Sequence, residues 1–267
     1  MEAISHSRNI THHFILVHGI GQGAWCWYKV KTILESSGHR VTALDLTASG
    51  TNLKKLSEVH TMLDYSEPLL SFMATIPDAE KVVLVGHSLG GINIAYAMER
   101  FPTKVSLAVF LTAFMPDTEH RPSYVLEKFL EMAPVDGWLD SQILLAEGPE
   151  KPKSTLLLGP KFSASKLYQN SPIEDLTLGT ILLRVGSMFL EDLSTSTKFS
   201  AEGFGSVNKA CIICKDDYAV DKKFPKWMIQ NNQVKEVKEI EGADHFAMFS
   251  KPREVCDALI ELANKYV

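Results

Sequence analysis

Several features that point to specialised classes of protein are scarce in this 267-residue chain. Its net charge is -5, so it lacks the basic surplus with which proteins bind nucleic acid. No apolar run approaches the roughly 20 residues that span a bilayer, and the first residues contain no apolar signal segment. We therefore expect a cytoplasmic protein whose partners include neither nucleic acid nor membranes.

Cysteine is also scarce, with four residues in the whole chain. Cys26 and Cys256 are isolated, whereas Cys211 and Cys214 form a C-x-x-C pair. A structural zinc site needs four ligands, and neither a second C-x-x-C nor a closely spaced histidine pair follows. We interpret the pair as small apolar residues of a buried strand, and we expect no metal site.

What the chain does contain is a regular alternation of short apolar runs with segments of helical periodicity. The apolar runs predict strands at 13–18, 40–46, 81–86, 104–111, 209–214 and 234–240. Helices are expected near 26–37, 64–75, 91–100, 221–231 and 252–265. Apolar strands that alternate with helices are typical of a parallel sheet covered on both faces. The sequence therefore predicts the α/β class, with a mostly parallel sheet flanked by helices, in one domain over 1–267.

The alternation is interrupted between about Pro116 and Leu190, where prolines are frequent and only short amphipathic pieces occur. Long stretches that lack the rhythm of the rest of a domain are usually functional insertions. We expect the core to comprise 1–115 and 191–267, and 116–190 to form an inserted cap that covers the site.

One serine lies in a pattern that suggests chemistry. Gly86-His87-Ser88-Leu89-Gly90 matches G-x-S-x-G, with a predicted strand before it and a predicted helix after it. This strand–turn–helix setting is the one in which a nucleophile elbow forms, because small residues allow a very sharp turn. The helix N-terminus that follows favours developing negative charge. We predict that Ser88 is the nucleophile.

A serine hydroxyl is a weak nucleophile unless a base accepts its proton. Among the nine histidines, His245 follows the last predicted strand, so its loop can return to the edge of the sheet where Ser88 is expected. The acid that orients this base should lie between them in the chain. Asp216 and Asp217 both follow the strand at 209–214, and spacing alone does not separate them.

The loop after the first predicted strand carries two competing signals. As an oxyanion loop, it would supply the main-chain N–H of Ile20, and Leu89 would supply a second donor. Its glycines also satisfy the G-x-G-x-x-G/A pattern of a dinucleotide site, with Asp45 as the ribose-binding acid. Bulky aromatics stand where the phosphate-binding helix would begin, and a dinucleotide site leaves Ser88 and His245 unexplained. A small-molecule receptor that uses the same pocket without catalysis is a further alternative.

The sequence resembles the plant methylesterase and hydroxynitrile lyase family of α/β-hydrolases along nearly its whole length. The motifs that carry the resemblance include "GAWCWYKV", "SGHRVTALDLTASG", "EKVVLVGHSLGG", "VFLTAFMPD", "EDLTLGTILLR" and "EGADHFAM". The resemblance implies the α/β-hydrolase fold with Ser88 as nucleophile, His245 as base and Asp217 as the orienting acid. It also implies oxyanion donors at Ile20 and Leu89, and a substrate pocket formed by Gly19, His18, Trp138, Phe129, Leu126, Phe246 and Met248.

Three positions separate the two chemistries of that family. The lyases resemble one another in having Thr, Glu and Lys where this chain has Gly19, His87 and Phe246, so the resemblance favours an esterase over a lyase. The chain departs from the usual pattern at Gly21 and Gln22, where Cys-His is common. We predict hydrolysis of a small-molecule methyl ester, from a plant hormone or a specialised metabolite such as an alkaloid, without metal or organic cofactor. The ester is the expected partner, and a homodimer is compatible with the sequence.

Overall fold

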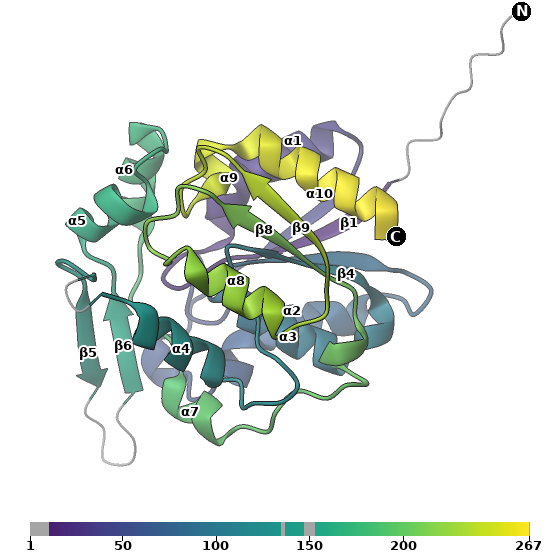
Figure 1. Cartoon of the computed structure of the whole chain (residues 1–267), viewed down its shortest axis with the longest axis horizontal. Coiled ribbons are helices and arrows are strands. Elements are labelled where there is room, and N and C mark those ends of the chain that lie inside the picture. Colours follow the sequence, from purple (N-terminus) through teal and green to yellow (C-terminus); the bar gives the residue numbers. More distant parts are fainter. Residues whose placement is uncertain (1–10, 135–136, 147–152, 267) are drawn as a thin grey trace, which may run out of the picture.

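A six-stranded parallel sheet forms the centre of the molecule (Figure 1). The computed structural model describes residues 11–134, 137–146 and 153–266. The sheet has the order β2-β1-β3-β4-β8-β9, and every neighbouring pair in it is parallel. Its strands are β1 (His13–Val17), β2 (Arg40–Leu44), β3 (Val82–His87), β4 (Val105–Leu111), β8 (Lys209–Cys214) and β9 (Val234–Ile240). The predicted α/β class is confirmed, and each predicted strand is present within two residues of its expected ends.

Alternate side chains of each central strand enter two hydrophobic cores, one on each face of the sheet. In β1, Ile15 and Val17 pack into one core, whereas Phe14 and Leu16 pack into the other. All four are fully buried, which explains why the run is apolar without a break. β9 lies at an edge of the sheet, and its residues alternate between partly buried and exposed along "VKEVKEI".

Helices cover both faces, as the periodicity predicted. The core that contains Phe14 packs against α1 and α10, which lie above the sheet in Figure 1, and the other packs against α2, α3 and α8. The bounds are α1 (Tyr28–Ser36), α2 (Met62–Thr75), α3 (Gly90–Arg100), α8 (Lys223–Gln230), α9 (Ala247–Ser250) and α10 (Pro252–Tyr266). Short 3-10 turns are η1 (Ala24–Trp27), η2 (Leu56–Glu58), η3 (Pro102–Lys104) and η5 (Phe204–Ser206).

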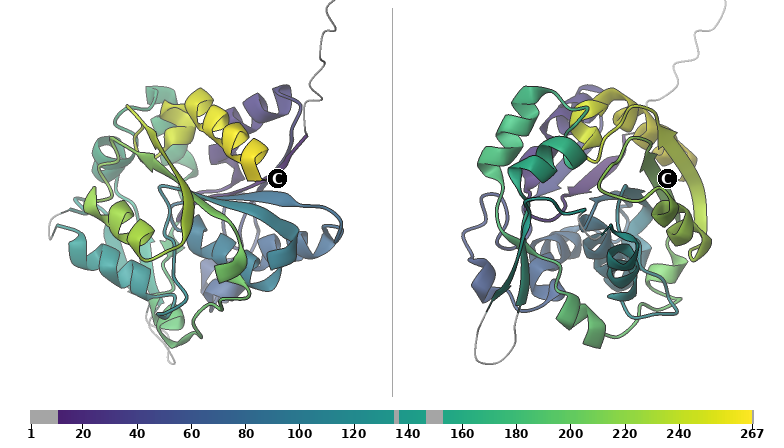
Figure 2. Two further views of the ribbon diagram at one scale, coloured as in Figure 1. Left: turned by 45° about the vertical axis from the view of Figure 1, so that its right-hand side comes forward. Right: turned by 60° about the vertical axis from the view of Figure 1, so that its left-hand side comes forward.

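Between β4 and β8 the chain leaves the main sheet, and we call this long connection the cap segment (residues 112–208). Figure 2 shows it from two further sides. It contains a three-stranded antiparallel sheet that the sequence did not predict, in the order β5-β6-β7. Its elements are α4 (Tyr124–Met132), β5 (Gln142–Ala146), β6 (Lys153–Leu157), α5 (Pro160–Phe162), the π-helix η4 (Ser163–Leu167), α6 (Ile173–Leu182), β7 (Gly186–Ser187) and α7 (Leu190–Thr195). The cap boundaries at 116 and 190 stay a prediction.

Hydrogen bonds fasten the cap segment to the core. The buried carboxylate of Asp175, in the first turn of α6, accepts from the Tyr28 hydroxyl at 2.8 Å and from Lys29 Nζ at 2.5 Å. The Arg184 N–H donates to the carbonyl of Gly21 at 2.9 Å. The cap segment is therefore tied both to α1 and to the loop after β1.

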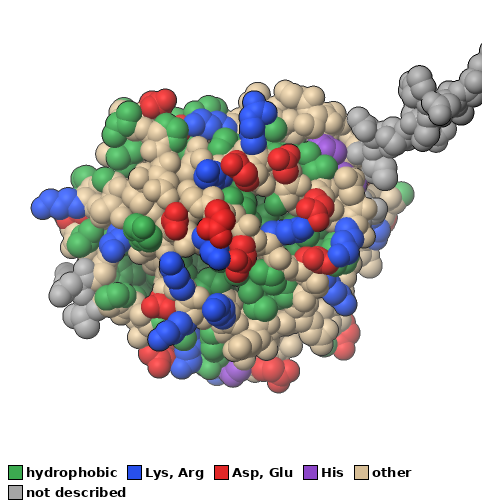
Figure 3. Space-filling model, turned by 45° about the horizontal axis from the view of Figure 1, so that its top comes forward, with side chains coloured by type: hydrophobic (Ala, Val, Ile, Leu, Met, Phe, Trp, Pro, Cys, Tyr) green, Lys and Arg blue, Asp and Glu red, His purple; other side chains and the backbone are tan. Residues whose placement is uncertain are grey.

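The surface is mixed in charge. On the face shown in Figure 3, acidic and basic side chains are interspersed. Ion pairs join neighbouring elements at this kind of surface, for example Lys238 on β9 with Glu261 on α10 at 2.5 Å. In the described ranges, no helix combines the length and the apolar composition that crossing a membrane requires.

Candidate active site

The backbone turns sharply at Ser88, between β3 and α3. Ser88 has φ of 52°, a left-handed conformation that is unfavourable for a residue with a side chain. The turn is possible because glycines lie two residues before and two residues after Ser88. A Cβ at Gly86 would lie 2.8 Å from the carbonyl oxygen of Gly90, and a Cβ at Gly90 would lie 2.6 Å from that of His18. The elbow geometry that the motif predicted is thus present, at the carboxyl edge of the parallel sheet.

His245 is hydrogen-bonded to Asp217, and both side chains are almost fully buried. Nδ1 of His245 lies 2.7 Å from Oδ2 of Asp217. Oδ1 of Asp217 accepts from the main-chain N–H groups of Ala219 at 2.9 Å and Val220 at 3.2 Å. Of the two acids left open by spacing, Asp217 is the one that contacts the histidine. Asp216 is turned toward Asn170, whose Nδ2 lies 3.3 Å from its carboxylate.

The loop that carries His245 is shaped by its other acidic neighbour, Asp244. Oδ1 of this buried carboxylate accepts from the Phe246 N–H at 3.1 Å and from the Ser250 hydroxyl at 2.8 Å. Oδ2 accepts from the Ser171 hydroxyl at 2.7 Å and from the Asn170 N–H at 3.0 Å, which joins the loop to the cap segment. Burial raises the pKa of Asp244, although these hydrogen bonds oppose the shift.

His87, next to Ser88 in the chain, supports the backbone of His245. Its Nε2 donates to the His245 carbonyl oxygen at 2.8 Å, and the two rings lie 4.9 Å apart. Burial, followed by the nearby charge of His245, lowers the pKa of His87 well below its ordinary value. His87 is therefore a neutral ring with the proton on Nε2, and its buried Nδ1 has no partner among the described residues.

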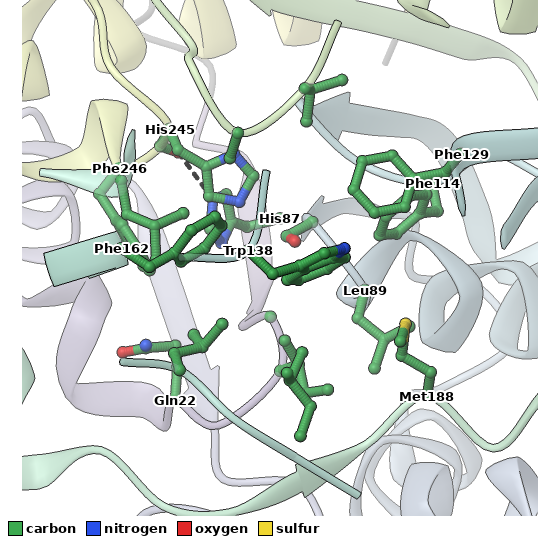
Figure 4. Close-up of a pocket in the computed structure, with 18 residues that line it drawn as sticks. Gln22, His87, Leu89, Phe114, Phe129, Trp138, Phe162, Met188, His245 and Phe246 are labelled. Carbon is green, nitrogen blue, oxygen red and sulfur yellow. Dashed lines mark hydrogen bonds between the residues drawn. The ribbon is translucent and has the colours of Figure 1, made fainter. Parts of the chain in front are cut away.

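Ser88 and His245 line one apolar cavity (Figure 4). Six further residues that the sequence placed in the site also line it, namely Gly19, Ile20, Leu89, Phe129, Trp138 and Phe246. In Figure 4 Trp138 extends across the cavity, with Phe114 and Phe129 on one side and Phe162 and Phe246 on the other. Trp138 contacts Phe129 edge to face, with centroids 6.0 Å apart, and stacks on Phe162 at 5.5 Å.

Three residues predicted to bind substrate, His18, Leu126 and Met248, are not among the described residues that line this cavity, and their role in binding substrate stays a prediction. His18 is fully buried at the end of β1, where Nδ1 donates to the Gly19 carbonyl at 2.8 Å and Nε2 accepts from the Leu46 N–H at 3.1 Å. Burial lowers the pKa of His18 to about 4. Leu126 and Met248 are fully buried in the two hydrophobic cores.

Several residues of the site were missed from the sequence. The cavity lining that was not predicted includes Gln22, His87, Phe114, Leu156, Leu158, Phe162, Leu167, Met188, Ala219 and Val220. Many of these belong to the cap segment, whose fold the sequence did not reveal. Thr112 was also missed, although its hydroxyl donates to Oδ2 of Asp217 at 2.5 Å. A polar residue directly after the buried strand β4 was the available signal.

The structure does not favour the dinucleotide alternative. The carboxylate of Asp45 accepts from the Ala24 N–H at 2.6 Å and from the N–H and hydroxyl of Thr51 at 3.0 and 2.8 Å. Asp45 therefore joins the loop after β1 to the loop after β2, and both of its oxygens are bonded within the protein instead of facing a ribose site.

No candidate metal centre emerges from the part of the chain that is described. Within those ranges, no three His, Cys, Asp or Glu side chains are grouped as metal ligands would be. The four cysteines are free and buried, and burial raises the pKa of Cys211 to about 12. A thiol of this kind is not a ready nucleophile or metal ligand.

Comparisons with known proteins agree with this geometry. A family model described as "Alpha/beta hydrolase family" matches residues 14–258. The chain is 50% identical over 254 residues to salicylic acid-binding protein 2 of Nicotiana tabacum, covering 95% of this chain and 98% of that protein. It is 50% identical over 256 residues to methylesterase 1 of Arabidopsis thaliana, covering 96% and 97%.

A solved structure is similarly close. The chain is 50% identical over 252 residues to polyneuridine aldehyde esterase of Rauvolfia serpentina, covering 94% of this chain and 96% of that protein. The crystal structure of polyneuridine aldehyde esterase superposes with a TM-score of 0.93 at 49% identity, covering 95% of this chain and all of the other.

Proposed function

Because the chain belongs to the alpha/beta hydrolase family, we propose that it is a serine carboxylesterase that hydrolyses the methyl ester of a small carboxylic acid. The resemblance to plant methylesterases is confirmed by relatives of 50% identity along nearly the whole chain. One observation carries the proposal. Ser88, held in a strained elbow, and His245, hydrogen-bonded to Asp217, line the same apolar cavity.

In the proposed reaction Ser88 attacks the ester carbonyl while His245 accepts the hydroxyl proton. Asp217 holds the imidazole by Nδ1, so that Nε2 is the nitrogen left for proton transfer, and stabilises the imidazolium that forms. The main-chain N–H groups of Ile20 and Leu89 are the proposed donors to the oxyanion. His245 then gives the proton to the methoxy oxygen as the C–O bond breaks, so that methanol departs, and water cleaves the acyl-enzyme in the same way.

The cavity indicates which acyl group would fit. Most of its lining is aromatic or aliphatic, as is typical of pockets that bind small apolar ligands. An aromatic or terpenoid-derived acyl group would bury its carbon skeleton against Trp138, Phe162 and Phe246. A plant hormone ester or an alkaloid ester meets this description. Phe246 has no polar group with which to hold a cyano group, and so the lyase alternative is disfavoured.

A second candidate is binding without turnover. It is favoured by the name of the tobacco relative, which describes the binding of salicylic acid. The cavity would hold the free acid in the position of the ester's acyl group, beside Ser88 and His245. Binding and hydrolysis would then use one cavity, and the two candidates differ in whether an acyl-enzyme forms.

The decisive experiment measures methanol release from methyl salicylate, methyl jasmonate and an indole-alkaloid methyl ester, with mandelonitrile as the lyase substrate. We expect turnover of at least one ester, and a loss of at least about 10³-fold in kcat in Ser88→Ala. Ser37→Ala, which changes a serine at the end of α1, is the matched control and should keep full activity. Cyanide release would favour the lyase. Calorimetric binding of salicylic acid with no turnover of any ester would favour the receptor.

We also propose a cytosolic location, supported by the four cysteines, which are free and buried. The homodimer stays a prediction, as does the expectation that the ester is bound without help from nucleic acid, membrane or cofactor.

A further inference from the structure

Thr112 has an unfavourable backbone conformation at the carboxyl end of β4. Its φ is 39°, in the left-handed region, and a β-branched residue is rarely found there. Conformations of this kind persist only where the surrounding structure imposes them, and they cluster at functional sites. The question is therefore what the side chain of Thr112 gains in this position.

The gain is a short hydrogen bond to the acid of the site. Oγ1 of Thr112 lies 2.5 Å from Oδ2 of Asp217, the same oxygen that lies 2.7 Å from Nδ1 of His245. The other oxygen, Oδ1, is occupied by the N–H groups of Ala219 and Val220. The carboxylate thus has two donors on each oxygen, and the hydroxyl shares one oxygen with the imidazole.

The turn that carries Thr112 also contacts the nucleophile elbow. The N–H of Phe114 donates to the carbonyl oxygen of Ser88 at 3.0 Å. The N–H of Thr112 itself donates to Ile212 on β8 at 2.9 Å, the strand that leads to Asp217. The backbone from Thr112 to Phe114 therefore connects the Ser88 elbow with the strand that leads to Asp217, independently of His245.

We infer that Thr112 is a positioning residue whose hydroxyl fixes the Asp217 carboxylate and limits how strongly that carboxylate holds the protonated imidazole of His245. A hydrogen bond donated to a carboxylate stabilises its charge, and so weakens its attraction for another cation. His245 must release its proton readily to act as a base at neutral pH. The inference rests on the proposed esterase function for its kinetic part only.

The other titratable groups around His245 are held independently of Thr112. From β3, His87 donates to the His245 carbonyl, and within the loop Asp244 is bonded to Ser171 and Ser250. From the segment after β8, Asp216 faces Asn170. Changing Thr112 therefore removes one hydrogen-bond donor from the Asp217 oxygen that faces the imidazole and leaves these other groups in place.

Thr112→Val tests the inference, since valine keeps the β-branched shape and loses only the hydroxyl. We expect the acid limb of its kcat/KM profile to move to higher pH by about half to one unit, because the imidazolium is held more tightly. One unit below the wild-type midpoint, the activity should fall by about three- to tenfold relative to wild type. Thr112→Ser keeps the hydroxyl and should follow the wild-type profile. KM should change little in either variant.

A second measurement requires no turnover. In Ser88→Ala protein with ¹⁵N-labelled histidine, the imidazole signals that disappear in His245→Gln report the titration of His245. Their midpoint should be higher in Thr112→Val than in unchanged Thr112. Thr112→Gly, which removes both the hydroxyl and the backbone strain, should show the same rise and secures the test if the valine variant does not fold.

The outcomes separate the inference from the proposed function. Equal midpoints in Thr112→Gly, Thr112→Val and the unchanged chain would overturn the inference, even if the protein hydrolyses esters normally. A raised midpoint in a protein that turns over none of the esters would support the role of Thr112 and refute the esterase. A serine variant that behaves like valine would show that shape, and not the hydroxyl, is what matters, and the inference would fail.

Discussion

Gly19→Ala is expected to damage catalysis while leaving the fold intact, because Gly19 packs directly against the nucleophile. A Cβ at position 19 would lie 2.9 Å from Cβ of Ser88, 3.2 Å from Nδ1 of His87 and 3.3 Å from the His87 carbonyl oxygen. Carbon atoms in good contact are about 3.5–4.0 Å apart, so the alanine must open at least about 0.6 Å of space.

The neighbours cannot give way easily. Ser88 lies in the strained elbow, and His87 is fixed by its bond to the His245 carbonyl. The loop itself must move, and the next residue of this loop is Ile20, whose N–H is a proposed donor to the oxyanion. A misplacement of about 1 Å costs on the order of 10²-fold, so about 0.6 Å should cost roughly tenfold in kcat/KM, equivalent to about 1.4 kcal/mol. A shift that also removed the oxyanion donor would raise the loss toward 10²–10³-fold.

Initial rates on p-nitrophenyl acetate and on the preferred methyl ester would measure the loss. Gly205→Ala is the matched control, since its Cβ would also be tight, 3.1 Å from the Ser200 carbonyl, but outside the lining of the cavity. The control should keep full activity, and urea unfolding should show both variants folded. If Gly19→Ala is folded and retains more than half of the wild-type kcat/KM, the reasoning from this contact is wrong.

Three further predictions concern stability and can be measured by urea unfolding. Gly91→Ala should lose about 3 kcal/mol or fail to fold, because its Cβ would lie 2.1 Å from the Phe114 carbonyl; a loss below about 1 kcal/mol would contradict this. Burial lowers the pKa of His18 from 6.5 to about 4 in the folded chain. Between pH 6.5 and pH 4 this imidazole is therefore protonated in the unfolded chain and neutral in the folded one. The free energy of unfolding should therefore fall by about 3 kcal/mol through His18 as the pH falls from 6.5 to 4. An equally steep fall in His18→Gln would refute the assignment. Asp175→Ala should lower the free energy of unfolding by about 2 kcal/mol, because the Tyr28 hydroxyl and Lys29 Nζ lose their buried acceptor on α6. An unchanged urea midpoint would count against this anchor.

The main sheet could be predicted because its signals are local. Each central strand is an unbroken apolar run, and each helix between the strands shows one apolar face, so period and length suffice to distinguish them. The elbow at Ser88 was equally local, since the glycines that permit it lie within three residues of it. His245 was found because it follows a strand, which places it at the same edge of the sheet as Ser88.

The parts that were missed depend on contacts between distant segments. In the cap sheet β7 is only the pair Gly186–Ser187, too short for a periodic pattern, and β5 and β6 lie in the stretch that lacks the strand–helix alternation of the core. The placement of Met188 and Leu156 in the cavity wall follows from how those strands pair. The family resemblance placed His18 in the pocket, but its ring turns inward and accepts a hydrogen bond from the Leu46 N–H. The choice between Asp216 and Asp217 likewise required the fold.

The bond from the Arg184 N–H to the Gly21 carbonyl has a consequence for redesign. Gly21 has φ of +71°, and a Cβ there would lie 2.7 Å from the Arg184 carbonyl. The two backbone segments therefore fit together only with glycine at position 21. Replacing the cap segment by that of another esterase, in order to change which acyl groups the cavity accepts, would place a different backbone segment against Gly21. A chimera should therefore exchange residues 19–23 together with the cap segment.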